Sequence, residues 1–92
     1  NPKVAILNQL TNETKRIVID NLDTLNYTIL RKSIAKSFGE ESVTLQLKQI
    51  VDSQKFLISN DSDMKALVED LKNESHSVSL VLEKLPSSGT IC

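Results

Sequence analysis

The sequence has few of the residues from which catalytic and metal sites are built. It contains one Cys and one His, Cys92 and His76, so neither has a second Cys or His at ligand spacing. No nucleophile and base pair, no paired carboxylates with a pocket signal and no Gly-rich phosphate loop can be found. We therefore predict no enzymatic activity, no metal and no cofactor. A single Cys cannot form an internal disulfide, which favours a reducing compartment.

Long apolar runs, aromatic side chains and excess positive charge are also missing. The longest apolar run is only a few residues, which predicts no membrane span and no secretory signal within these residues. Aromatic residues make up 3% of the chain and the net charge is −1, so a basic stripe with stacking platforms for nucleic acid is not expected. Because the chain opens with Asn1-Pro2 rather than Met, we expect it to be a fragment of a longer protein.

The composition that is present describes one small folded domain. Of 92 residues, 39% are hydrophobic and 25% are charged, with only 2 Gly and 2 Pro. We predict a single domain over residues 1–85 and a disordered tail over residues 86–92, "PSSGTIC". Residues 1–36 hold six basic side chains against three acidic ones, a net of +3, whereas residues 37–92 hold five against nine, a net of −4. Such charge asymmetry influences which partners the domain binds and how electrostatic attraction steers them toward it.

The first half of the chain predicts a hairpin followed by a helix. "KVAIL" and "KRIVID" are short β-branched and aliphatic runs, and the polar residues between them predict a turn near Thr11 to Glu13. A helix is expected next, with Asn26 as its N-cap and Gly39 just past its end. Its apolar stripe consists of Tyr27, Leu30, Ile34 and Phe38.

The second half predicts two strands, a helix and a final strand. "VTLQLKQ" alternates strictly and directs Val43, Leu45 and Leu47 to one face, and "KFLIS" follows as another strand. The apolar residues of the next segment recur at helical spacing, at Met64, Leu67, Val68 and Leu71. "SVSLVLEKL" then alternates again, with Val78, Leu80 and Leu82 on one face.

The predicted order is strand, strand, helix, strand, strand, helix, strand. A hairpin, a helix that crosses the sheet, further strands and a last strand beside the first describe the ubiquitin-like β-grasp. This is an α+β fold in which a mixed sheet packs on the first helix.

Two segments resemble a known family of this fold, the Phox-and-Bem domain (PB-one domain). "YTILRKSIAKSFG" is similar to the family's first helix, and "LISNDSDMKALVEDL" is similar to the end of its acidic motif, where a strand is followed by acidic residues and an amphipathic helix. The resemblance implies a non-catalytic interaction module of a signalling kinase or scaffold protein.

Members of that family pair front to back, with a basic face on one domain against an acidic loop on the next. The resemblance assigns the basic face to strand one, strand two and helix one; the candidate residues are Lys3, Lys15, Arg16, Arg31 and Lys32. Depending on the alignment of the hairpin, the basic position of strand one falls on Lys3 or on Asn8. The implied partner is a domain with an acidic surface.

The acidic motif is reduced in this chain. Where the family has an acid-rich loop with a central Gly, the sequence reads "IVDSQK", which keeps only Asp52, replaces the Gly by Ser53 and continues with Lys55. One carboxylate beside an ammonium group gives little concentrated negative potential. Asp61 and Asp63 fall in or beside the first helical turn, where carboxylates are favoured without any partner. We therefore predict an atypical, basic-face member.

Three alternatives stay open beside a cytoplasmic PB-one-like module. Ras-binding domains share the β-grasp and use the same basic residues of strand two and helix one against a GTP-bound small GTPase. Four segments starting at Asn12, Asn26, Asn60 and Asn73 fit the N-glycosylation pattern, which would place the chain in a lumen, although each Asn also suits a turn or a helix end. Self-association through the charge asymmetry is the third.

Overall fold

The computed structural model describes residues 3–73 and 78–85. The predicted tail over residues 86–92, together with His76 and Cys92, lies outside the described residues. The elements are β1 (Lys3–Asn8), β2 (Glu13–Val18), α1 (Tyr27–Phe38), the short 3-10 helix η1 (Glu40–Thr44), β3 (Gln46–Val51), β4 (Gln54–Ile58), α2 (Asp61–Lys72) and β5 (Val78–Glu83). Their order agrees with the predicted one, with η1 added.

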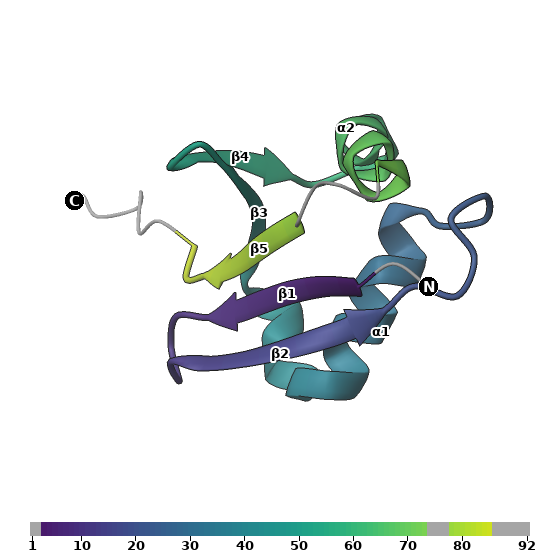
Figure 1. Cartoon of the computed structure of the whole chain (residues 1–92). Helices are drawn as coiled ribbons and strands as arrows, with labels where there is room; N and C mark the ends of the chain where they lie inside the picture. Colours follow the sequence, from purple (N-terminus) through teal and green to yellow (C-terminus); the bar gives the residue numbers. More distant parts are fainter. Residues whose placement is uncertain (1–2, 74–77, 86–92) are drawn as a thin grey trace.

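The five strands form one mixed sheet in the order β2-β1-β5-β3-β4. β1 pairs with β5 in parallel, and the other three pairings are antiparallel. β5 is the last strand in the chain but lies at the centre, where it joins the two hairpins. α1 passes behind β1 and β2, and α2 lies beside the end of β4 (Figure 1). The fold is the predicted α+β ubiquitin-like β-grasp.

A single core fills the space between the sheet and the helices. It takes alternate residues from the strands, as the period of two requires, and the apolar stripes of both helices. β5 contributes Val78, Leu80 and Leu82, α1 contributes Leu30 and Ile34, and α2 contributes Met64, Leu67 and Leu71. Tyr27, Phe38 and Val68 are partly buried against this cluster, so the predicted stripes of both helices are confirmed.

Both helices begin at an asparagine. The Oδ1 atom of Asn26 accepts a hydrogen bond from the Ile29 N–H at 2.8 Å, and Oδ1 of Asn60 accepts one from the Asp63 N–H at 3.0 Å. These bonds satisfy amides that have no partner within the helix. α1 ends at Phe38, and Gly39 follows it with a φ of 99°, in a region that glycine adopts without strain. The predicted N-cap and stop of α1 are confirmed.

The prediction of a strand starting at Val43 is wrong. Val43 and Thr44 belong to η1, and Val43 is 53% exposed. Two local hydrogen bonds favour this turn: the Ser42 hydroxyl donates to the Gly39 carbonyl at 2.7 Å, and the Thr44 hydroxyl donates to the Glu41 carbonyl at 2.9 Å. Ser and Thr side chains that bond nearby backbone in this way compete with strand pairing.

The boundaries of the first hairpin also differ from the predicted ones. β2 covers residues 13–18 rather than 15–20, and residues 9–12 form the turn. Asn8 ends β1 with its side chain buried, and its Oδ1 accepts a hydrogen bond from the Leu10 N–H at 2.9 Å. This bond closes the chain locally, which lets β2 begin two residues earlier.

Candidate functional site

Lys15 and Arg16 are neighbours in sequence but lie on opposite faces of β2. Lys15 is paired with Ile6, whose side chain is in the core, so Lys15 faces α1. Arg16 is paired with Ala5 and faces the side of the sheet away from the helices. The period of two along a strand dictates this division. The predicted basic pair is therefore two separate cations on either side of one strand.

The Lys15 ammonium group is held against the end of α1. Its Nζ donates a hydrogen bond to the Ser37 carbonyl and lies 5.3 Å from the centre of the Phe38 ring. Two interactions stabilise the ammonium group at this position. The last carbonyls of a helix carry partial negative charge, and the face of an aromatic ring attracts cations. Lys15 thus stabilises the contact between β2 and α1 as well as carrying charge.

Lys3 and Arg16 come together on the face of the sheet away from the helices. Lys3 is paired with Val18 at the start of β1, and both Lys3 and Arg16 are exposed. In this register the two cations are diagonal neighbours on adjacent strands, with Cα atoms about 7–8 Å apart. No described acidic residue is paired with either position.

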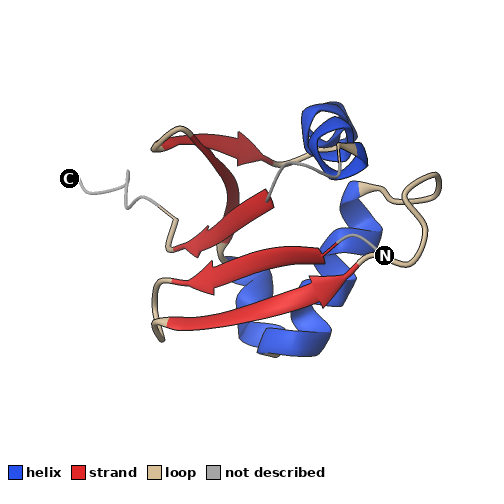
Figure 2. Ribbon diagram, in the orientation of Figure 1, coloured by secondary structure: helices blue, strands red, loops and turns tan. Residues whose placement is uncertain are grey.

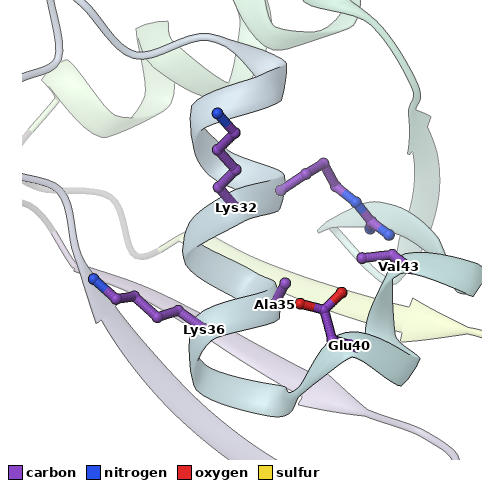
Figure 3. A pocket seen from close by; sticks show the side chains of 6 residues that line it. Lys32, Ala35, Lys36, Glu40 and Val43 are labelled. Atoms are coloured by element: carbon purple, nitrogen blue, oxygen red, sulfur yellow. The ribbon is translucent and has the colours of Figure 1, made fainter.

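Lys32 and Lys36 form the outer basic surface of α1. Both are exposed and border a shallow hollow of about 350 Å³ together with Ala35, Glu40 and Val43 (Figure 3). Figure 3 shows the Lys32 side chain running along the helix and the Lys36 side chain projecting sideways from it. Lys36 was not among the predicted site residues, although its spacing of four from Lys32 places it on the same helix surface.

Arg31 is drawn into the fold instead of the solvent. Its Nη2 donates hydrogen bonds to the Ser42 carbonyl at 2.9 Å and the Leu45 carbonyl at 3.1 Å. Its Nη1 is buried without a hydrogen-bond partner. The guanidinium group therefore ties α1 to η1 and to the start of β3. The structure does not bring Arg31 together with Lys15, which contacts the C-terminal end of the same helix.

The β3–β4 turn leaves space for one carboxylate. Val51 pairs with Gln54, so the turn consists of Asp52 and Ser53 alone, with φ values of 50° and 69°. Two successive positive φ values are typical of the tight turns that connect antiparallel strands. Asp52 is exposed at the tip, and no second acid accompanies it within the turn.

The next basic residue, Lys55, is paired within the sheet. The Glu83 carboxylate accepts bonds from both Lys55 Nζ and Lys48 Nζ, the latter at 2.8 Å. Hydrogen bonds from these two lysines, with Lys48 the larger cause, lower the pKa of Glu83 from its usual range. Glu83 is therefore ionised in the fold and already has its cations.

Asp61 and Asp63 take part in the start of α2. Asp61 Oδ1 accepts a hydrogen bond from the Tyr27 N–H at 2.8 Å, which joins the first turns of the two helices. Asp63 Oδ2 accepts bonds from the Ser59 N–H at 3.0 Å and from the Ser59 hydroxyl at 3.1 Å. Their placement in the first turn is as predicted, and both carboxylates hold backbone there.

Two further properties concern metal binding and membrane spanning in the part of the chain that the structure describes. Among residues 3–73 and 78–85, no group of three or more His, Cys, Asp or Glu side chains could hold a metal ion. Within the same ranges, no helix is long and apolar enough to cross a membrane.

The fold and these surfaces describe a ubiquitin-like interaction module. Comparison with protein families gives a match to the PB1 domain over residues 9–85, most of the chain. The chain therefore belongs to the PB1 domain family, the Phox-and-Bem family that it resembles, whose members are protein–protein interaction modules that bind other PB1 domains. The match begins after β1, so it does not extend to Lys3. No curated protein matches the chain.

Proposed function

We propose that this PB1 domain binds the acidic loop of another PB1 domain through a basic edge, as part of a cytoplasmic signalling kinase or scaffold protein. The basic edge consists of Lys3, Lys15, Arg16 and Lys32, around strand β2. The observation that carries the proposal is the contrast between the two sheet edges. β2 is an edge strand with a cation on each face, whereas the turn next to the other edge strand, β4, carries one carboxylate.

Arg16 is the central group of the basic edge. It is exposed, it has no acidic residue opposite it in the sheet, and its guanidinium group can bind a carboxylate through two parallel hydrogen bonds. Lys3 adds a second charge on the same face. Lys32 adds charge from α1, which contacts β2. We assign Arg31 to the fold, because its guanidinium group is occupied by two carbonyls.

The test is a charge reversal at two exposed positions, Arg16→Glu with Lys32→Glu. Affinity for a PB1 domain with an intact acidic loop is measured by isothermal titration calorimetry at low and high salt. We expect a loss of about 100-fold, because each reversal replaces attraction with repulsion. Wild-type binding should also weaken as salt rises. Lys65→Glu with Lys72→Glu, two exposed positions on α2, is the matched control and should bind as wild type.

The proposal is wrong if the double reversal at Arg16 and Lys32 leaves affinity unchanged while the domain stays folded by circular dichroism. Lys15 is tested separately as Lys15→Gln, because its contacts with Ser37 and Phe38 link it to stability. A loss of affinity without a loss of folded protein would place Lys15 in the contact.

A small GTPase is the second candidate partner. The observation in its favour is that β2 is unpaired on its outer side, and an exposed edge strand can add a strand from another sheet. A pull-down with GTP-loaded and GDP-loaded GTPases separates the two functions. Retention only with GTP would support this candidate and contradict the PB1–PB1 proposal.

A further inference from the structure

One face of the sheet is left uncovered by the described part of the chain. The alternate residues that do not enter the core point to the side opposite both helices, and Figure 2 shows no helix in front of β1 and β2. The apolar residues on this face, here called the open-face floor, are Ala5, Leu7, Val18, Ile50, Leu57 and Val81. Every strand contributes to it.

The residues of the open-face floor are neighbours across the sheet, since Leu7 pairs with Val81 and Ile50 lies diagonally between Val81 and Leu57. Val81, in the central strand, is fully buried although it lies outside the core cluster, and it is paired with Leu7 on one side and Lys48 on the other. Val18 and Leu57, near the two edges, are each 47% exposed. A sheet with an apolar second face is one that another layer can cover.

The charges around the floor are strongly one-sided. Among the residues of the five described strands, four Lys and Arg side chains point to this face, but only one Asp or Glu side chain does so. These are Lys3 and Arg16 on one flank, and Lys48, Lys55 and Glu83 on the other. The described strand residues of the open face thus carry a formal charge of +3, although the whole chain carries −1.

We propose that the open face binds an acidic amphipathic helix of a partner protein. The apolar side of such a helix would cover the floor, and its carboxylates would meet the cations on both flanks. Lys55 is available for this because its side chain is 42% exposed even while it contacts Glu83. This contact differs from the PB1–PB1 contact, because it depends on the floor and on β3 and β4 as well as on Lys3 and Arg16.

The spacing of the strands suits a helix. Neighbouring strands lie about 4.8 Å apart, so the flank on β1 and β2 and the flank on β3 and β4 are separated by roughly 10–19 Å. An α-helix with its side chains is about 10–12 Å across. A helix aligned with the strands is therefore wide enough to lie between the two rows of cations and to contact both.

Two adjacent residues of β4 provide a matched test. Leu57 faces the open face and Phe56 faces the opposite side, and the two are about equally exposed, at 47% and 50%. Leu57→Asp places a carboxylate on the floor, and Phe56→Asp places the same carboxylate on the other face of the same strand. Both variants are checked for folding by circular dichroism and urea unfolding.

The probe is a fluorescein-labelled synthetic peptide with Leu at helical i, i+3, i+4 and i+7 spacing and Glu on its other faces. Its binding is measured by fluorescence anisotropy, with a peptide of scrambled order as the control. We expect the ordered peptide to bind at least about tenfold more tightly than the scrambled one, and Leu57→Asp to weaken it by about tenfold or more. Phe56→Asp should stay within about twofold.

The proposal is overturned if the ordered and scrambled peptides bind equally, or if the two Asp variants weaken binding equally. It is also overturned if the domain binds phosphatidylserine-containing vesicles but not the peptide, because the ligand of the open face would then be a membrane surface. The outcome is independent of the PB1–PB1 contact. The acidic-loop partner should bind the Leu57→Asp variant as it binds the wild type, since β4 is at the edge opposite β2.

Discussion

The two hairpins of this domain have similar sizes but different charges at their outer strands. In the first hairpin, β2 carries Arg16 exposed and without an acid opposite it. In the second hairpin, the cation of β4, Lys55, is bound to Glu83, and the turn shows only Asp52. The difference lies in pairing: Lys55 has an acidic partner within the sheet, whereas Arg16 has none in β1.

This comparison teaches that a count of charges does not locate a binding surface. Five positions were predicted as one basic face, yet two of them serve contacts within the fold. Arg31 bonds two carbonyls, and Lys15 contacts a helix end. Whether a cation can bind a partner depends on which groups of the fold lie next to it. Arg16 in the first hairpin has no acidic neighbour across the sheet, whereas Lys55 in the second hairpin has Glu83.

The largest expected effect comes from giving the second hairpin an acidic loop. Replacing Asp52-Ser53 by Asp-Glu-Asp-Gly-Asp should let the turn of one molecule bind the basic edge of another, with about 1.5 kcal/mol or more from each close charge pair. Sedimentation velocity should then show a mass that rises with concentration more steeply than for the wild type. Adding Arg16→Glu should return the variant to wild-type behaviour; if assembly persists, the basic edge is not the partner of the loop.

A second prediction separates structural cations from available ones on the same helix. Arg31→Ala should lower the free energy of unfolding by about 2–3 kcal/mol, because two hydrogen bonds from a charged group are lost. Lys32→Ala, one residue away and exposed, should change it by less than about 0.5 kcal/mol. Urea unfolding measures both. Similar values for the two variants would contradict the structural role of Arg31.

A third prediction compares the two hairpin turns. Ser53 has a φ of 69° and Asn12 a φ of 60°, a region that costs most side chains energy but that Asn tolerates. Ser53→Gly should therefore raise the free energy of unfolding by about 1 kcal/mol. Asn12→Gly should raise it by less, and thermal unfolding of the two variants side by side gives the comparison. A larger increase in the free energy of unfolding for Asn12→Gly would show that backbone strain does not determine the difference between the two turns.

The smallest expected effect concerns the ion pairs that occupy the second hairpin. The pKa of Glu83 is lowered in the folded state, so its contribution is present above its unfolded pKa and is lost as pH falls through the lowered value. We expect Glu83→Gln to cost less than about 1 kcal/mol at neutral pH, since both lysines are partly exposed. Urea unfolding from pH 7 downward should show the difference vanish in acid. If the difference in free energy of unfolding between the wild type and Glu83→Gln grew as the pH fell, the stabilising role of the ionised Glu83 would be contradicted.

Much of the fold could be predicted because local signals agree with the packing. The stripe of α1, its Asn26 cap and its Gly39 stop are all found as expected, and so is the alternation in β5. The start of β3 could not be predicted in this way. "VTLQLKQ" has a strand period throughout, but hydrogen bonds from Ser42 and Thr44 hold the first part in η1. Those bonds depend on where α1 ends.

The site is predictable from the sequence in part. The period of a strand already requires that Lys15 and Arg16 face opposite sides, so they could have been separated from the sequence. The direction of Arg31 was not accessible, because a position on the flank of a helix points to solvent or to a neighbour depending on η1. Asp61 and Asp63 were correctly explained as residues of a helix start.

The two-residue length of the β3–β4 turn has a consequence for assembly. PB1 domains that carry both a basic face and an acidic loop have two docking ends and can extend a row of copies in either direction. A turn that holds Asp52 and Ser53 alone has no space for a cluster of carboxylates. Under the proposed function this domain is therefore monovalent: it would join a row at one end, and the row would stop there. Turn length, rather than total charge, would then determine how long such an assembly grows.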